Sequence, residues 1–433
     1  MFALAPARTP DHLRETEPMV PTAELRDAAL RPRLAIRCAL TAMVVGLVLT
    51  ERFAVAIGTF YLGVSLPMMY VLLTVLLLTG HLAVDAVSLL LYSGVVGVAV
   101  TSFLLNANID GGNGTSITSM YLLLALYLPL VFVLSPRPEN RAHWRWMMGM
   151  LSTVLLIVAI AGIVQFYVQF VFRPTWLFDI SELIPTPIRG QGIYNSAIPI
   201  GSLFKANGFA MREPSGFSYL MAFGLITELA LFKRRKRMAC FGLALLLSYS
   251  GTGLLALAIG VLLPVRAKML VRLGIGAVVV VGCNLLVGDP LNLAFTFSRV
   301  GEFSSQGSSA YSRYVAPWHL VDAGIDVTPW SIWLGHGPGM ITKGATAFES
   351  HDPTWAKLLY EYGIGGLLIF LAFIAYKLAA FAAPFQFRAV LFASWLVMGG
   401  HLLSPENVGF LFVVMAVWGR AVAADPEEEG RPA

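Results

Sequence analysis

The feature that most constrains the fold of this chain is a series of apolar runs, many of them long enough to cross a lipid bilayer, that recurs along nearly all of its 433 residues. Crossing a hydrocarbon core of about 30 Å takes about 20 mostly apolar residues in helical form. Because the runs lack the alternation typical of strands, helices rather than a closed barrel would satisfy their backbone hydrogen bonds. Hydrophobic residues make up 57% of the chain and charged residues 13%, which excludes an ordinary soluble globule. We therefore expect an all-α, polytopic membrane protein.

Hydropathy predicts about twelve membrane-spanning helices. The predicted spans are residues 34–50, 58–79, 82–104, 116–134, 146–171, 214–232, 238–249, 251–265, 271–288, 357–378, 388–403 and 407–422. Basic clusters fall at alternate connections, for example Lys233–Arg237 between the sixth and seventh spans, and the positive-inside rule places these connections in the cytoplasm. Both termini then lie in the cytoplasm, with residues 1–30 as a disordered tail, residues 31–422 as the transmembrane domain and residues 423–433 as a second tail.

The seventh and eighth spans form the shortest pair and meet at Ser248–Gly253. Small hydroxyl residues and glycines can satisfy a turn that is buried at membrane depth. We expect this turn to lie below the outer surface, facing protein or water.

Two connections on the outer side, residues 172–213 and 289–356, are too long to be simple turns. They contain tryptophans, prolines and glycines, so we expect them to fold over the membrane surface. Their basic residues, which the positive-inside rule disfavours on this side, are Arg173, Arg189, Lys205, Arg212, Arg299, Arg313 and Lys343. Any single arginine could instead pair with a local acid on a solvated surface, and the acids available are Asp179, Glu182, Glu302 and Asp322. Taken as a set, the basic residues favour a binding site for an anion.

The segment Asn207–Ser218 ends the first long connection and places Arg212 and Glu213 directly before Pro214. Proline is common at the first position of a helix, so we expect the sixth span to begin there. The free N–H groups and the positive dipole end of that helix, beside Arg212, suit a phosphate group. A structural role is also compatible, with Glu213 as a carboxylate on the helix dipole and Ser215 in the first turn.

The second long connection ends in a glycine-rich turn followed by a histidine. Gly335, Gly337 and Gly339 permit backbone conformations that are closed to other residues, which suits a tight turn or the close approach of a ligand. His351 stands just before the tenth span, where an imidazole that titrates near neutral pH could accept a proton from a hydroxyl, with Asp352 available to orient it. Structural hydrogen bonding is the plainer role for a histidine at a membrane interface.

Two other histidines, His336 and His319, are rival candidates for chemistry. Together with His351 they could form a zinc site, but they lack a recognisable ligand spacing. The three cysteines all fall in apolar runs without CxxC spacing, which argues against a metal site or a disulfide framework. We expect no metal and no cofactor.

In combination, these motifs resemble the signature of the superfamily of O-antigen ligases and O-antigen or exopolysaccharide polymerases. The signature is a G-x-G-x-G turn, a histidine before an outer-face helix, a glutamate and a G-x-x-G pair, here Gly335–Gly339, His351, Glu361 and Gly363–Gly366. The segment Phe209–Phe217 is similar to the F-x-E-P-S-x-F pattern of exopolysaccharide polymerases. The small-residue turn and an R-x10-G spacing resemble further family features, and they lie at Ser248–Gly253 and from Arg313 to Gly324.

The resemblance implies a glycosyltransferase at the periplasmic face of the bacterial inner membrane. Members of the superfamily transfer a glycan from undecaprenyl pyrophosphate to the hydroxyl of an acceptor, with inversion and without a metal. His351 would be the general base, and arginines would hold the diphosphate as bidentate donors. The implied substrate-binding residues, with the first two favoured, are Arg212, Arg313, Arg299, Arg189 and Glu213.

The partners that the resemblance implies are an undecaprenyl-pyrophosphate-linked oligosaccharide and the lipid bilayer. A chain-length regulator and export machinery are further candidates, and no nucleic acid is expected.

Three functions remain open from the sequence. A polysaccharide polymerase leads, because the stretch R-E-P-S-G-F at Arg212–Phe217 resembles polymerases. An O-antigen ligase acting on lipid A core or a protein would differ only in its acceptor. A transporter or flippase for lipid-linked glycans would bury ionisable residues in the middle of helices and show repeated halves, and neither feature is evident.

Overall fold

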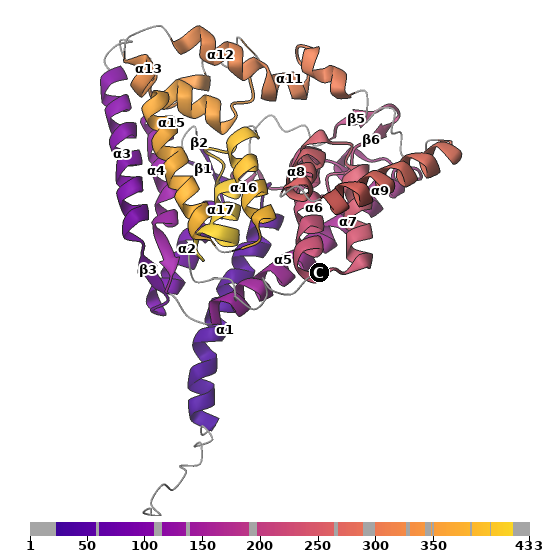
Figure 1. Ribbon diagram of the computed structural model, residues 1–433, viewed down its shortest axis with the longest axis horizontal. Coiled ribbons are helices and arrows are strands. Elements are labelled where there is room, and N and C mark those ends of the chain that lie inside the picture. Colours follow the sequence, from indigo (N-terminus) through magenta and orange to yellow (C-terminus); the bar gives the residue numbers. More distant parts are fainter. Residues whose placement is uncertain are drawn as a thin grey trace, which may run out of the picture.

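Figure 1 shows the computed structural model of the chain. It describes residues 23–57, 60–107, 115–135, 139–189, 197–263, 267–288, 299–325, 330–342, 348, 350–381, 383–398 and 400–418. The predicted C-terminal tail and residues 1–22 of the predicted N-terminal tail lie outside these ranges. Helix α1 (Ala23–Leu49) begins inside the stretch that was predicted to be disordered, so residues 23–30 are helical.

Helices dominate the described residues, which confirms the predicted all-α class in its coarse form. The strands in these residues form short two-stranded antiparallel sheets, which the sequence analysis did not predict. The pairs are β1 (Ala54–Ile57) with β2 (Phe60–Gly63), β3 (Leu82–Val84) with β4 (Phe132–Leu134), and β5 (Pro199–Ile200) with β6 (Leu203–Phe204).

Among the described residues, four helices are long and apolar enough to cross a membrane. They are α3 (Ala86–Asn106), α5 (Glu139–Val168), α6 continued by the π-helical turn η5 (Pro214–Thr227 and Glu228–Phe232), and α15 (Thr354–Ala380). All four coincide with predicted spans.

The other apolar helices are shorter than the length that a full crossing takes in straight helical form. They are the Ile36–Leu49 part of α1, α2 (Ser65–Leu78), α4 with η1 (Ile117–Tyr127 and Leu128–Val131), α8 (Gly251–Leu262), the Gly274–Leu286 part of α9 (Ala267–Leu286), α16 (Phe385–Val397), and α17 with the π-helical turn η7 (Pro405–Leu411 and Phe412–Ala416). Each of these overlaps a predicted span, and the remaining span overlaps α7 (Arg235–Leu247). Each predicted span is helical over most of its length, but β2, β3 and β4 occupy ends of the spans predicted at 58–79, 82–104 and 116–134. The number of crossings stays a prediction.

The two long outer connections fold into short elements. The first contains η2 (Thr175–Leu177), η3 (Ile180–Leu183), η4 (Thr186–Ile188) and the β5–β6 hairpin. The second contains η6 (Arg299–Ser304), α11 (Ser309–Tyr314), α12 (Ala316–Ile325) and α13 (Ser331–Leu334). Figure 1 shows α11, α12 and α13 together at one end of the body, next to the start of α15.

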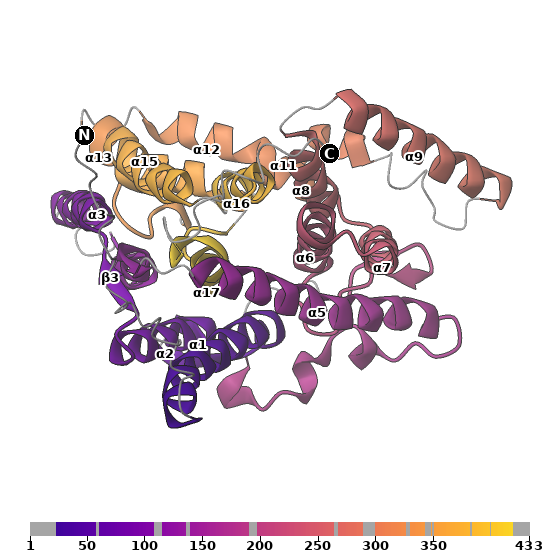
Figure 2. The same cartoon turned by 60° about the horizontal axis from the view of Figure 1, so that its bottom comes forward.

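Helix α17 and η7 run through the centre of the body, between α15 and α16 on one side and α1 and α2 on the other (Figure 2). Every residue from Val408 to Trp418 is buried. The indole N–H of Trp144 donates to the carbonyl of Val414 at 3.1 Å, and that of Trp418 donates to the carbonyl of Val413 at 2.7 Å. These bonds satisfy carbonyls that a wide π-helical turn leaves less well paired.

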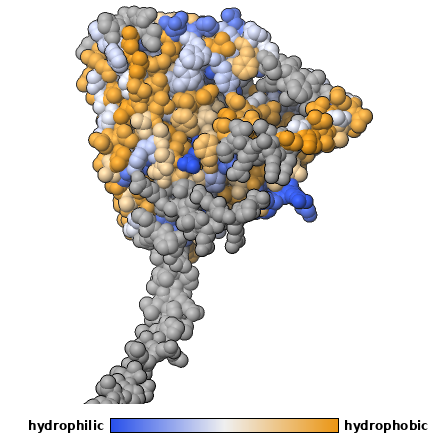
Figure 3. Space-filling view, in the orientation of Figure 1, coloured by the Kyte–Doolittle hydropathy of each residue, from blue (hydrophilic) through white to orange (hydrophobic). Residues whose placement is uncertain are grey.

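The outer surface carries many large apolar side chains. Leu90 on α3, Ile157 on α5 and Val278 on α9 are all more than half exposed, at 71%, 62% and 73%. Figure 3 shows apolar residues over much of the visible body. Extended exposed apolar surface of this kind is typical of contact with lipid.

Candidate functional site

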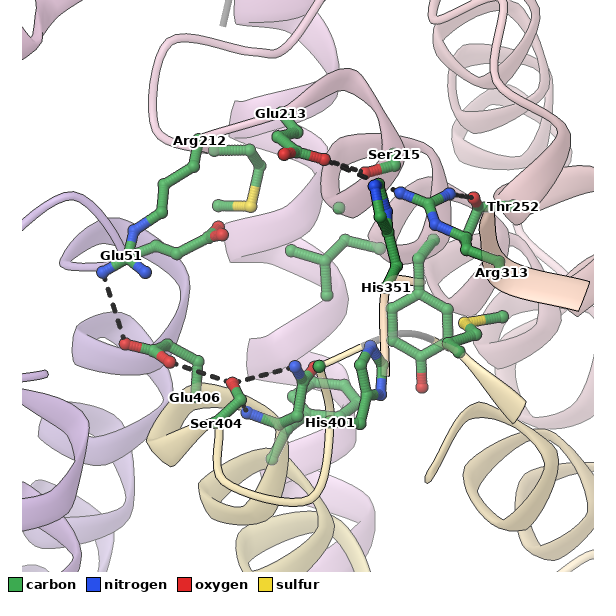
Figure 4. Close-up of a pocket in the computed structure, with 18 of the residues that line it drawn as sticks. Glu51, Arg212, Glu213, Ser215, Thr252, Arg313, His351, His401, Ser404 and Glu406 are labelled. Atoms are coloured by element: carbon green, nitrogen blue, oxygen red, sulfur yellow. Dashed lines mark hydrogen bonds and ion pairs between the residues drawn. The ribbon is translucent and has the colours of Figure 1, made fainter. Parts of the chain in front are cut away.

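A pocket of about 540 Å³ opens around the start of α17 (Figure 4). Segments that are far apart in the sequence line it: the end of α1, the start of α6, the start of α8, α11, the residues before α15, and residues 398 and 400–410. Four predicted site residues, His351, Arg212, Arg313 and Glu213, are all among the lining residues.

His351 presents its side chain to the pocket beside Arg313 and Ser215 (Figure 4). Its backbone N–H donates to the carbonyl of Ser312 at 2.9 Å, which ties it to α11. Partial burial lowers the pKa of His351, and Arg313 lowers it further, against an opposing effect of Glu213. The imidazole is therefore neutral at pH 7, which is the form that can accept a proton.

The rival histidines lie elsewhere. His336 Nε2 is 2.7 Å from the carbonyl oxygen of Gly324, and its ring packs against Tyr360 with centroids 4.7 Å apart. His319 is exposed on α12. Within the described ranges, no group of three or more His, Cys, Asp or Glu side chains could hold a metal ion.

Arg212 and Arg313 each hold a carboxylate in the pocket. Arg212 Nη2 lies 3.6 Å from Glu406 Oε1, and Arg313 Nη2 lies 3.8 Å from Glu213 Oε2. Arg313 Nη1 also donates to Thr252 Oγ1 at 3.0 Å. The arginine side chains are only 15% and 17% exposed, so an anion that reaches them is less screened by water than it would be on an open surface. Neither carboxylate is one of the local acids that the sequence suggested.

Neither of the two second-choice arginines is among the described residues that line this pocket. Arg189 donates from both Nε and Nη2 to the carbonyl of Ile184, at 3.0 and 2.8 Å, and is not among the lining residues. Arg299 begins η6, and its side chain lies outside the described part of the structure.

Helix α6 begins at Pro214, as predicted. Glu213 precedes it in extended conformation, and its side chain makes no capping hydrogen bond to the helix. Its Oε2 instead accepts from Ser215 Oγ at 2.8 Å and faces Arg313. The carboxylate therefore belongs to the pocket more than to the helix end.

Arg52 fixes the backbone that carries Arg212, a role that the sequence analysis missed. Its side chain is 2% exposed. Its Nε donates to the carbonyl of Phe209 at 2.9 Å, Nη2 donates to the carbonyl of Met211, and Nη1 lies 3.1 Å from Asp179 Oδ1. A planar guanidinium whose donors reach two loops at once holds both loops against the end of α1.

The glycine-rich turn contacts α15, and none of its glycines lines the pocket. Gly335 adopts φ 68° and ψ −166°, and Gly363 inside α15 adopts φ 66° and ψ −167°, a conformation essentially restricted to glycine. A Cβ at either position would overlap the opposing backbone. The N–H of Gly337 donates to the carbonyl of Glu361 at 2.9 Å. We call this contact of Gly335, Gly337 and Gly363 the glycine clamp, and it fixes the bend of the helix that follows His351.

Glu361, the glutamate of the signature, is fully buried. It is not among the described residues that line the pocket. Its Oε1 lies 3.5 Å from Lys357 Nζ, one helical turn earlier. This glutamate helps to hold the region of the glycine clamp together and does not face the pocket.

The turn at Ser248–Gly253 packs tightly against α6. Its first residues, Ser248 and Tyr249, face the protein interior, while its predicted depth in the membrane stays a prediction. The N–H of Gly253 donates to Ser218 Oγ at 3.0 Å. A Cβ at Gly253 would overlap the carbonyl of Ser218. This close approach places Thr252 in the pocket, where it contacts Arg313.

The pocket also contains polar residues that the sequence analysis did not single out. They are Glu51, Thr252, His401, Ser404, Glu406 and Asn407. Glu406 Oε2 accepts from Ser404 Oγ at 3.0 Å. A signal was present in the sequence, because Glu51 directly follows the first predicted span and Glu406 directly precedes the last, and ionisable residues beside apolar segments are functional candidates.

Two carboxyl groups in the pocket have raised pKa values. Burial raises the pKa of Glu51 to about 7; Arg212 and Arg52 oppose the shift, and Glu406 and Glu213 add to it. Burial also raises the pKa of Asp352, against the opposing charge of Lys357.

Comparison with models of known protein families and with curated protein sequences finds no match for this chain. The function is therefore inferred from the pocket. Two guanidiniums, a neutral imidazole and several carboxyl groups at one site are suited to binding a multivalent anion and to moving a proton.

Proposed function

We propose that this chain is a glycosyltransferase of the O-antigen ligase and polymerase superfamily and acts as a polysaccharide polymerase in the bacterial inner membrane. The observation that carries the proposal is that Arg212, Arg313 and His351 line one pocket. They come from the residues before α6, from α11 and from the residues before α15, so they meet only in the folded protein.

The donor in this proposal is a glycan on undecaprenyl pyrophosphate. Guanidinium groups bind phosphate oxygens through paired N–H donors, and the low exposure of Arg212 and Arg313 strengthens such contacts. The diphosphate would take the place of Glu406 and Glu213 at these arginines. The apolar outer surface is compatible with a bilayer that holds the lipid tail.

The reaction moves one proton and one glycosyl group. A hydroxyl oxygen of the acceptor sugar attacks the anomeric carbon of the donor, and the bond from that carbon to the diphosphate oxygen breaks with inversion. The electron pair leaves on the diphosphate, whose charge Arg212 and Arg313 stabilise. His351 takes the proton of the attacking hydroxyl.

The membrane arrangement that goes with this reaction has about twelve crossings with both termini in the cytoplasm. Arg313 and His351 belong to the second long outer connection, so the pocket would open toward the periplasm. A chain-length regulator and export machinery remain proposed partners.

The resemblance of Arg212–Phe217 to polymerases favours a second lipid-linked glycan as the acceptor. Ligation to lipid A core would use the same donor and the same base, and it would leave a different product.

The test is glycosyl transfer in membranes or detergent with purified lipid-linked repeat unit. His351→Gln should lose roughly a hundredfold or more in rate, which is the scale for a positioned base. Arg212→Ala and Arg313→Ala should each lose roughly 10²–10³-fold, and lysine at either position should restore little, because a point charge does not reproduce a guanidinium fork. Arg173→Ala, which removes an exposed outer-side arginine, is the matched control and should retain activity.

Gene deletion should cause single-repeat lipid-linked glycan to accumulate while polymer disappears. Accumulation of unmodified lipid A core beside intact lipid-linked polymer would identify a ligase instead. Full activity of His351→Gln at normal abundance would overturn the base assignment, and loss of wild-type activity to a chelator would overturn the metal-free reaction.

A further inference from the structure

Charge in the pocket is unbalanced if all of its carboxyl groups are ionised. The described lining contains two arginines, Arg212 and Arg313, and four carboxyl groups, Glu51, Glu213, Glu406 and Asp352. With neutral histidines, such a pocket would carry net negative charge and repel the diphosphate that the proposed function requires. At least one carboxyl group must therefore hold a proton when such a ligand binds.

Hydrogen bonding separates the glutamates. Glu213 accepts from Ser215 Oγ and lies near Arg313, and Glu406 accepts from Ser404 Oγ and lies near Arg212. Each of these two carboxyl groups therefore already has a hydroxyl donor and a nearby guanidinium. Within the described residues, no hydrogen bond reaches the Glu51 carboxyl group. Glu51 thus differs from the other two glutamates of the pocket, which both accept a hydrogen bond from a serine hydroxyl.

The position of Glu51 fits contact with a ligand at Arg212. Glu51 follows the last turn of α1, and its side chain passes beside Arg212 and points its carboxyl group into the pocket (Figure 4). Its Oε1 also comes within 3.8 Å of where a Cβ of Gly216, in the first turn of α6, would stand. It therefore lies between Arg212 and the N–H groups that suit a phosphate.

The charges around Glu51 come from every side of the pocket. Arg212 and Glu213 lie before α6, Arg52 is the next residue of the chain, and Glu406 lies on α17. The more distant wall carries Arg313, His351, Asp352 and His401. Burial raises the pKa of Glu51 to about 7 in this setting, which makes the protonated form well populated at neutral pH.

We propose that Glu51 binds the donor as a carboxylic acid, donating its O–H to a phosphate oxygen of the diphosphate while Arg212 supplies the positive charge. This inference rests on the proposed function and deepens it. Donor binding then takes up a proton whenever Glu51 was ionised beforehand. No bond in the donor changes in this step, and the proton comes from solvent.

The proposal predicts a pH dependence of donor affinity. If only the protonated form binds, the dissociation constant should rise roughly tenfold between pH 6 and pH 8 for a group that titrates near 7. Glu51→Gln keeps an N–H donor and has no charge, so its affinity should match the wild type at pH 6 and exceed it at pH 8.

The experiment is calorimetric titration of the purified full chain in detergent with undecaprenyl diphosphate. Titrations at pH 7 in two buffers of different ionisation enthalpy give the number of protons taken up, and we expect about half a proton more for wild type than for Glu51→Gln. The comparison removes the diphosphate's own protonation, which both proteins share. Asp322→Asn, which removes an exposed carboxylate of α12, should behave as wild type.

Each outcome decides the matter. Equal pH profiles and equal proton uptake for wild type and Glu51→Gln would overturn the role of Glu51 while leaving the proposed function intact. Loss of binding in Glu51→Gln, with a normal elution profile and melting temperature, would also overturn it, because the carboxylate would then be the required form. Should Glu51→Gln fold poorly, the wild type alone decides: it should take up protons from the buffer when it binds undecaprenyl diphosphate at pH 7, and no uptake would overturn the role of Glu51. Failure of wild type to bind the diphosphate at any pH would overturn the proposed function as well.

Discussion

Replacing Gly363 with alanine should loosen the glycine clamp and shift the helix that follows His351. Gly363 adopts φ 66° and ψ −167° inside the 27-residue helix α15, a conformation that other residues adopt only with strain. An alanine Cβ at this position would also overlap the backbone of Trp333 and Leu334. Because these are backbone atoms, they cannot turn aside as the end of a flexible side chain can.

The size of the effect follows from these two contributions. The backbone strain costs about 1–3 kcal/mol, and an overlap that forces the backbone to move costs about 1–3 kcal/mol more. We expect the free energy of unfolding to fall by roughly 3–5 kcal/mol and the melting temperature to fall by several degrees. The proposed glycosyl transfer should fall further than stability predicts, because the clamp also anchors α15, whose start follows His351.

The assay is thermal unfolding of purified protein in detergent, followed by tryptophan fluorescence, with transfer measured on the same samples. Gly201→Ala is the matched control for strain alone, because Gly201 has φ 58° and an added Cβ would meet nothing within 4 Å. It should cost only about 1–2 kcal/mol. Gly97→Ala controls for the substitution itself, since Gly97 is helical and equally open, and it should cost nothing.

The reasoning fails if Gly363→Ala melts no lower than Gly201→Ala and transfers glycan at the wild-type rate. A loss of stability with unchanged transfer per folded molecule would keep the clamp as a structural contact and remove its influence on His351.

Two further predictions concern residues around Arg212. Arg52→Met should lower the free energy of unfolding by about 3–5 kcal/mol, because Asp179 and the carbonyls of Phe209 and Met211 lose their partner. Melting curves measure the loss, and adding Asp179→Asn should recover part of it. A wild-type melting temperature for Arg52→Met would contradict the prediction. Wild-type stability should fall as pH rises from about 4.5 through about 7, because the raised pKa of Glu51 means that the folded state keeps a proton that the unfolded state has already lost. The contribution is on the order of 1–3 kcal/mol. Between pH 5 and pH 8 the melting temperature of Glu51→Gln should therefore change less with pH than that of the wild type. The same pH dependence in both proteins would count against the prediction.

The helices were predictable from the sequence because long apolar runs favour lipid or a protein interior, where a helix satisfies the backbone hydrogen bonds within the segment. Pro214 marked the start of α6 for a local reason that the fold did not override. The hairpin of β1 and β2 was not predictable, since Phe60–Gly63 is as apolar as the helix that follows it. Periodicity cannot separate a short buried strand from the end of a helix.

The pocket was predictable only where local motifs pointed to it. Arg212 and His351 stand beside predicted helix starts, and Arg313 was noted for its charge in an outer connection and its spacing to Gly324. Glu51 and Glu406 approach Arg212 by tertiary packing from opposite ends of the chain, and no local pattern encodes such a contact. The glycine-rich turn was recognised as a turn, but its partner was the backbone of α15, which only the fold reveals.

The central place of α17 has a consequence for how the protein is made. A chain is synthesised from its N-terminus, so the segment that fills the middle of the body, Pro405–Ala416, emerges after every helix that surrounds it. Until it arrives, α1, α2 and α4 lack their contacts with α17, and Glu406 is missing from the pocket. Contacts between such distant parts of a chain form slowly. We therefore expect assembly to end with a single late step, in which the core and the pocket are completed together.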